Sequence, residues 1–163
     1  MATSTTTSVW RSGGGDTTKT AYAGSMLMAA DFYFVPTAAA GNKVQKSSTD
    51  TANVILPIGA VITEIQANAA GTGGSSPTFD MGFTLYSSGT TNNASLLNEA
   101  DADAGKQIFN WATATVPGAS LGAVLSTSEL VYITGSVGAS AATGGSVTGK
   151  LFYYVPTSGS YTA

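Results

Sequence analysis

The sequence predicts an all-β fold, an antiparallel β-sandwich that is jelly-roll-like or of a related Greek-key type. Three observations predict this class: several short segments with β-strand patterns, Gly-rich turns between them, and little helix-forming sequence. The clearest pattern lies at residues 77–86, where Phe79, Met81, Phe83 and Leu85 alternate with polar or small residues. This period of two is typical of a half-buried strand, so we expect residues 77–86 to be the central strand of the core.

Residues 1–25 are predicted to form an extended, flexible N-terminal arm, and residues 26–163 the β-sandwich domain. The arm is rich in Thr, Ser and Gly and has no sustained hydrophobic period. It contains Trp10 beside Arg11, and a large aromatic side chain in an arm commonly docks in a pocket of its own chain or of a neighbour. The alternative that Trp10 simply covers its own core stays open.

Further strands are predicted on both sides of the central one. Residues 31–36 carry aromatic side chains on both faces, which indicates a strand that is buried twice or covered by a partner. A tight turn at Pro57-Ile58-Gly59 separates the strands expected at 52–56 and 60–69, and another strand is expected at 107–115.

The C-terminal part and one internal segment complete the predicted elements. Residues 129–137 and 146–155 are rich in β-branched and aromatic residues, and we expect them to pair as a hairpin with a flexible tip. One short helix is expected at residues 94–103, which are rich in Ala, Leu and Glu and follow Asn93 as a candidate N-cap.

Charge and hydropathy limit the classes of partner. Charged residues make up 9% of the chain, against about a quarter in ordinary soluble domains. The net charge is −3 and the six Lys and Arg residues are scattered, so we expect no nucleic-acid binding. No apolar run approaches the roughly 20 residues that span a bilayer, and no secretion signal is visible. We expect synthesis in the cytoplasm and a neutral surface that is easy to desolvate.

The inventory of reactive side chains argues against catalysis. The chain has no His and no Cys, which removes the commonest general base, the commonest transition-metal ligand and any thiolate nucleophile. We therefore expect no enzymatic activity, no cofactor and no bound metal. Residues 13–20 resemble a phosphate loop only superficially, because Thr18 stands where the second Gly belongs. Glu99, Asp101 and Asp103 lack the distal Glu of a calcium loop, so a solvated segment is expected; opportunistic calcium binding and glycoside hydrolysis by these carboxylates stay as alternatives.

The order of several motifs resembles small virion proteins of tailed bacteriophages. The motifs are the Leu-Pro-x-Gly-Ala turn and following strand at 56–65, the x-Asp-x-Gly strand at 79–82, Leu96-Leu97 before the Asp-rich residues 101–105, and the Gly-rich segment at 144–155. The resemblance covers roughly residues 52–157. The Trp10 arm and residues 32–50 fall outside it.

The resemblance implies a head decoration or cement protein. Such a protein is a β-sandwich that sits on the exterior of the capsid in the virion and ties neighbouring subunits of the major capsid protein together. It also implies self-association, as a trimer or a dimer. The residues expected to contact the capsid or another partner are Trp10 and Arg11 in the arm, with Phe32 and Tyr33 as second choices.

The alternative is a receptor-binding or glycan-binding fibre or tail module. It would use the loops at 70–76, 87–93 and 138–145. An aromatic platform for sugar stacking is a further alternative to packing in the core or an interface, which is the commoner role of such side chains. Its members would be Tyr132, Phe152, Tyr153 and Tyr154.

Overall fold

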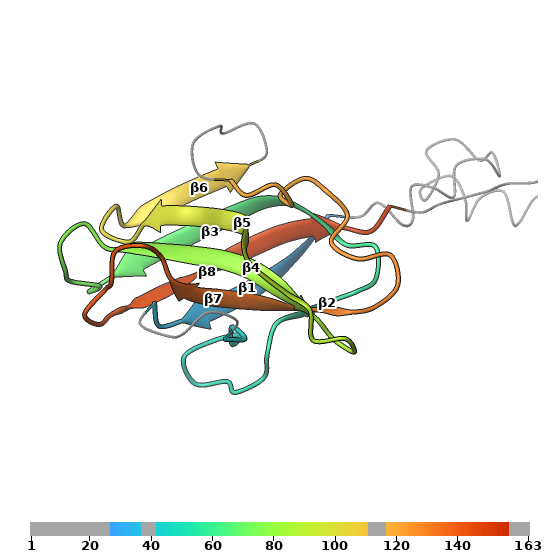
Figure 1. Ribbon diagram of the computed structural model, residues 1–163, viewed down its shortest axis with the longest axis horizontal. Coiled ribbons are helices and arrows are strands. Elements are labelled where there is room, and N and C mark those ends of the chain that lie inside the picture. Colours follow the sequence, from blue (N-terminus) through green and yellow to red (C-terminus); the bar gives the residue numbers. More distant parts are fainter. Residues whose placement is uncertain (1–26, 37–41, 111–116, 157–163) are drawn as a thin grey trace, which may run out of the picture.

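Two four-stranded antiparallel sheets pack face to face in the computed structural model (Figure 1). The structure describes residues 27–36, 42–110 and 117–156. The strands are β1 (Met28–Phe34), β2 (Ile55–Leu56), β3 (Val61–Ala70), β4 (Thr78–Leu85), β5 (Thr91–Asp101), β6 (Lys106–Asn110), β7 (Val131–Val137) and β8 (Ser146–Tyr154). The first sheet has the order β1-β8-β3-β6 and the second the order β2-β7-β4-β5. The all-β prediction is confirmed.

Strands from the first half of the chain pair with strands from the second half. β1 pairs with β8, β2 with β7, β3 with β6, and β4 with β5, each antiparallel. The β3–β8 and β4–β7 pairs then join these ribbons into two sheets. Because β7 and β8 lie in different sheets, the predicted C-terminal hairpin is wrong, and residues 138–145 instead cross from one sheet to the other.

The core lies between the sheets and is built from the inward positions of the strands. β4 lies between β7 and β5, and its Phe79, Met81 and Phe83 are buried, so the predicted central strand is confirmed. The first sheet contributes Phe34, whose ring meets that of Phe79 edge-on at 5.9 Å between centroids. Other fully buried side chains are Phe32, Val44, Val54, Leu56, Ile62, Ile65, Leu96, Leu97, Ile133 and Leu151.

The helix predicted at 94–103 is wrong, since these residues lie largely in β5 and the described residues contain no helix. The buried residues Leu96, Leu97 and Ala100 do have a helix-like spacing. It arises because β5 is bulged: Ala100 lies opposite Phe79 but Leu97 lies opposite Met81, three residues against two. Glu99 takes up the extra length with a φ of 57°, and its amide donates to Asp80 Oδ1 at 2.7 Å.

Residue Gly135 of β7 allows the sheets to approach closely. A Cβ atom at this position would lie 2.7 Å from the ring of Phe34. Gly135→Ala is therefore expected to destabilise the fold by about 1–3 kcal/mol through overpacking. Denaturant unfolding measures this, and Gly144→Ala is the control because its Cβ would meet nothing closer than 3.9 Å. Equal stability of the two variants would contradict this account of the sheet packing.

Candidate functional site

The connections gather at two opposite ends of the sandwich. Leu56 and Leu85 both lie opposite Val131, so the β2–β3 turn, the β4–β5 turn and the start of β7 share one end. In the first sheet Met28 lies opposite Tyr153, near the start of β3, so β1 begins at the same end. This is the right-hand end in Figure 1, and the β3–β4, β5–β6 and β7–β8 connections lie at the left.

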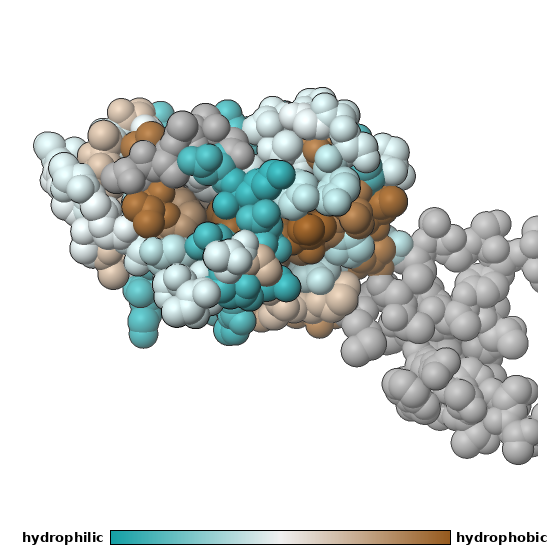
Figure 2. All heavy atoms as spheres, turned by 90° about the horizontal axis from the view of Figure 1, so that it is seen from below, coloured by the Kyte–Doolittle hydropathy of each residue, from teal (hydrophilic) through white to brown (hydrophobic). Residues whose placement is uncertain are grey.

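Exposed apolar side chains are concentrated at the first of these ends. Of the eight large apolar side chains that are exposed among the described residues, all except Ile108 lie there. We call this set the apolar end: Leu27, Met28, Ile55, Ile58, Tyr86, Val124 and Leu130, which are 36–61% exposed. Figure 2, seen from the side of residues 42–54, shows the larger group of apolar atoms toward this end and a smaller group toward the opposite end. Such a concentration is typical of interaction surfaces.

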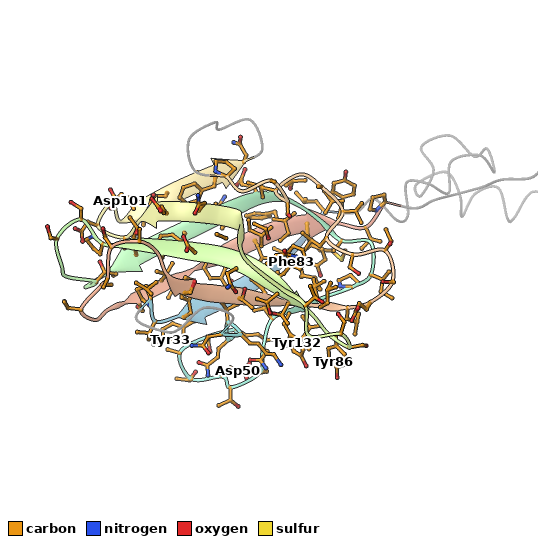
Figure 3. All side chains as sticks on the ribbon, in the orientation of Figure 1. Tyr33, Asp50, Phe83, Tyr86, Asp101 and Tyr132 are labelled. Atoms are coloured by element: carbon orange, nitrogen blue, oxygen red, sulfur yellow. The ribbon has the colours of Figure 1, made fainter. Side chains whose placement is uncertain are left out.

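A stack of two tyrosines lies within the apolar end. The rings of Tyr86 and Tyr132 are 5.0 Å apart between centroids and nearly parallel, at 17° (Figure 3). Lys43 Nζ lies 3.7 Å from the centroid of the Tyr132 ring, a cation–π contact. Desolvation, followed by the neighbouring Tyr86, raises the pKa of the Tyr132 phenol, which stays protonated at neutral pH. Tyr86 is 49% exposed and offers an aromatic surface of the kind that anchors protein interfaces.

Glu129 holds the turn that carries Tyr86. Its carboxylate accepts hydrogen bonds from the amides of Ser87 and Ser88, at 2.5 and 3.0 Å, and the Tyr86 amide donates to the Leu130 carbonyl at 2.9 Å. The hydrogen bond from the Ser87 amide, which has the larger effect, and that from the Ser88 amide lower the pKa of Glu129 below its ordinary 4.5. The stack is therefore positioned by hydrogen bonds between the β4–β5 turn and the segment that leads into β7.

The opposite end of the sandwich is polar. The amides of Thr143 and Gly144 donate to the Thr72 carbonyl, which joins the β7–β8 and β3–β4 connections. The Thr72 hydroxyl lies 3.2 Å from Asp103 Oδ1, and the Asp103 amide donates to Asp101 Oδ1 at 2.7 Å. These carboxylates thus serve local turns. In the part of the chain that the structure describes, no three His, Cys, Asp or Glu side chains come together as metal ligands.

The structure separates the elements of the glycan hypothesis. Loops 70–76 and 138–145 are joined at the polar end, whereas loop 87–93 lies at the apolar end. Tyr132 belongs to the second sheet, while Phe152, Tyr153 and Tyr154 belong to β8 in the first, so the four aromatics do not form one platform.

The described residues contain no helix long and apolar enough to cross a membrane.

The four residues predicted to contact a partner lie in different environments, and two of them are outside the described residues. Trp10 and Arg11 lie outside the described residues. Phe32 is 1% exposed and packs in the core, so its side chain presents no surface to a partner. Tyr33 is half-buried, and its backbone exchanges two hydrogen bonds with Gln45, at 2.7 and 2.9 Å.

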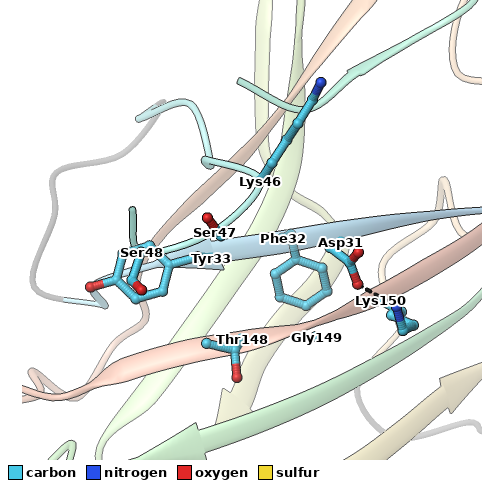
Figure 4. A pocket seen from close by; sticks show the side chains of 9 residues that line it. All are labelled: Asp31, Phe32, Tyr33, Lys46, Ser47, Ser48, Thr148, Gly149 and Lys150. Atoms are coloured by element: carbon cyan, nitrogen blue, oxygen red, sulfur yellow. Dashed lines mark hydrogen bonds and ion pairs between the residues drawn. The ribbon is translucent and has the colours of Figure 1, made fainter. Parts of the chain in front are cut away.

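A hollow of about 430 Å³ lies beside Tyr33 on the edge of the first sheet (Figure 4). Lys150 and Asp31 form an exposed ion pair on its rim, marked by the dashed line. Residues 46–48 from the segment after Gln45 form another part of the lining. The hollow therefore lies where β1 meets the segment that connects the two sheets.

The sequence analysis missed Tyr86, Ile55 and Leu130. The alternation of residues along the predicted strand could have indicated that Leu130 is exposed. Leu130 and Tyr132 lie on one face, and Val131 and Ile133 on the other face are fully buried. The alternation of side chains along a strand predicts only which face each side chain is on. It does not predict that three strands end together, so the gathering of these side chains needed the fold.

Comparison with known proteins yields little. No protein-family model matches the chain, and no curated protein is similar to it. Among solved structures, a chain of the cyanophage Pam1 capsid asymmetric unit is similar at 14% sequence identity, with a TM-score of 0.43. The alignment covers 82% of this chain and 87% of that chain. At this TM-score the similarity carries no conclusion about function.

Glu129→Gln is expected to lower the melting temperature at pH 7, because the neutral amide accepts the Ser87 and Ser88 hydrogen bonds more weakly. A lowered folded-state pKa stabilises the protein above the ordinary value of 4.5, and this stabilisation is lost as the pH falls through the folded-state pKa. The two proteins should therefore converge in acid. Thermal unfolding from pH 7 to 3 measures this, with Glu99→Gln as the control for net charge; a pH-independent difference would contradict it.

Proposed function

We propose that the chain is a virion structural protein, a decoration or cement protein that binds the exterior of an assembled phage head and ties neighbouring capsid subunits together. The observation that carries the proposal is the apolar end, where all but one of the exposed large apolar side chains among the described residues gather. A partner that covers them gains about 25 cal/mol for each Å² of apolar surface removed from water.

The strand order supports this class of protein. The strand orders, β1-β8-β3-β6 in one sheet and β2-β7-β4-β5 in the other, are compatible with the proposed double-sheet jelly roll. Jelly rolls are used by viral capsid proteins and by lectins. Since a fold hosts many functions, the choice between these two depends on the surface.

The low content of charged residues favours binding to a neighbouring protein over remaining free in solution. With 9% charged residues, few ions need to be desolvated when the chain is packed against a neighbour. The tyrosine stack at the apolar end adds rigid aromatic area, which costs little conformational entropy on binding. The major capsid protein is the proposed partner, together with other copies of the chain in a trimer or dimer. Trp10 and Arg11 remain proposed contacts of the arm.

The proposed mechanism is thermodynamic linkage and needs no catalytic step. A protein that binds the assembled shell but not the dissociated subunits shifts the equilibrium toward the shell. One binding site filled at a hundred times its dissociation constant contributes about 2.7 kcal/mol. Many copies on one head add up to a large stabilisation.

Glycan recognition by a fibre or tail module is the second candidate. The half-exposed ring of Tyr86 is the observation that favours it, because a sugar ring stacks on an open aromatic face. Tyr86→Leu keeps an apolar side chain but removes the aromatic face. It should abolish glycan binding if the second candidate is correct, and largely preserve binding to heads if the first is.

The double variant Ile55→Ser/Leu130→Ser tests the proposed function. The two side chains are 42% and 39% exposed, so the fold should lose little stability. Burial of their exposed parts is worth about 1–2 kcal/mol each, so the affinity for heads should fall roughly tenfold per residue. The measurement is co-sedimentation with heads of the virus that encodes the chain, from which this protein has been stripped.

Ile108→Ser is the matched control for that experiment. Ile108 is 60% exposed but lies on β6, away from the apolar end, so its loss should leave binding to heads unchanged. If the unaltered chain fails to sediment with heads, the proposed function is wrong. If Ile108→Ser weakens binding as much as the double variant, the apolar end is not the contact surface.

A further inference from the structure

The edge of β1 is paired along only part of its length. Tyr33 turns its backbone N–H and C=O away from β8 and exchanges hydrogen bonds with Gln45. Because backbone direction alternates along a strand, Asp31 and Ala29 turn their N–H and C=O groups the same way. No hydrogen bond joins these groups to another described residue. Within the described residues, the first sheet therefore ends in a short open edge that an added strand can pair with.

A groove runs beside this open edge, between the two sheets. It has a volume of about 560 Å³, and its lining includes Ala29, Ala30 and Tyr153 from the first sheet, Ile55 from the second, and Val54 from the segment before β2. The small side chains of β1 leave room for a neighbouring backbone. At about 3.3 Å per residue, a segment of roughly three to five residues covers the open edge.

The charges around the groove balance. Asp31 is paired with Lys150, and Lys46 and Asp50, which also line the groove, carry opposite charges. A segment with no net charge therefore fits it best. Ile55 belongs both to the groove and to the apolar end, and Met28 directly precedes the open edge, so the two surfaces are continuous.

We propose that an uncharged, extended segment of the head protein enters this groove and pairs with Ala29 and Asp31 as an added strand of the first sheet. This inference rests on the proposed function and specifies how the partner is held. Backbone pairing would supply affinity, while the adjoining apolar end would supply buried area. The occupant is recognised through its extended backbone and lack of charge, and it continues onto the contact surface already described.

Hydrogen exchange of the Ala29 and Asp31 amides tests the proposal on the full chain. Both amides should exchange rapidly in the free protein, and at least about tenfold more slowly in the protein bound to heads. Slow exchange in the free protein at every concentration would mean that residues 1–26 of the same chain fill the groove. Protection that rises with protein concentration alone would mean that a second copy fills it. Either result overturns the proposal.

Ala29→Pro provides a second, independent test. Proline removes only the N–H that points away from β8, so the β1–β8 ladder keeps its hydrogen bonds and the edge strand tolerates the change. Affinity for heads should fall about tenfold, because one backbone pair is lost and the proline ring blocks the edge. Ile108→Ser, on β6 at the opposite edge of the first sheet, is the control and should bind normally.

The outcomes separate this proposal from the proposed function. If neither the unaltered chain nor either variant sediments with heads, the proposed function itself fails. If all three bind equally and the Ala29 and Asp31 amides stay unprotected on heads, the function stands and the added strand is wrong. Thermal unfolding of Ala29→Pro shows whether the variant is folded, and the exchange measurement on the unaltered chain decides the question if it is not.

Discussion

The close approach of Phe34 to Gly135 is the contact on which the arrangement of the two sheets depends. A glycine on β7 lets the aromatic ring of β1 sit against the backbone of the opposite sheet, and the same ring meets Phe79 of the central strand. Residues 42–54 then connect the two edges: Val44 donates to the Ile133 carbonyl at 2.9 Å, and Gln45 pairs with Tyr33. The described residues thereby close this side of the sandwich along half of β1 and leave the other half unpaired.

When each strand of the first half of the chain pairs with its counterpart in the second half, alternate connections fall at opposite ends. One set is polar and bonded together around Thr72. The other carries the apolar end, with Tyr86 and Tyr132 stacked inside it. The two ends of one small domain therefore differ strongly in the surface that they offer to a partner.

This difference fits a protein whose work is adhesion. Side chains such as Leu130 and Ile55 cost free energy while they face water, and a partner that covers them recovers it. The low charge of the chain keeps the opposing desolvation cost small. Oriented contact at one end of the domain is compatible with the proposed role on a capsid surface, where the other end would face outward.

The sequence by itself determined the fold class, the central strand and the absence of His and Cys, because these follow from local period and composition. It misassigned residues 94–103, because their Ala, Leu and Glu content favours a helix locally, whereas pairing with β4 holds most of them in β5. It offered Phe32 as a second-choice partner contact, whereas the structure buries Phe32, because a strand with aromatics on both faces does not reveal which face points inward. Only the tertiary structure decided that β7 and β8 part into different sheets and that the exposed apolar residues share one end. Those features depend on pairings between residues far apart in the chain, and a local pattern carries no information about such pairings.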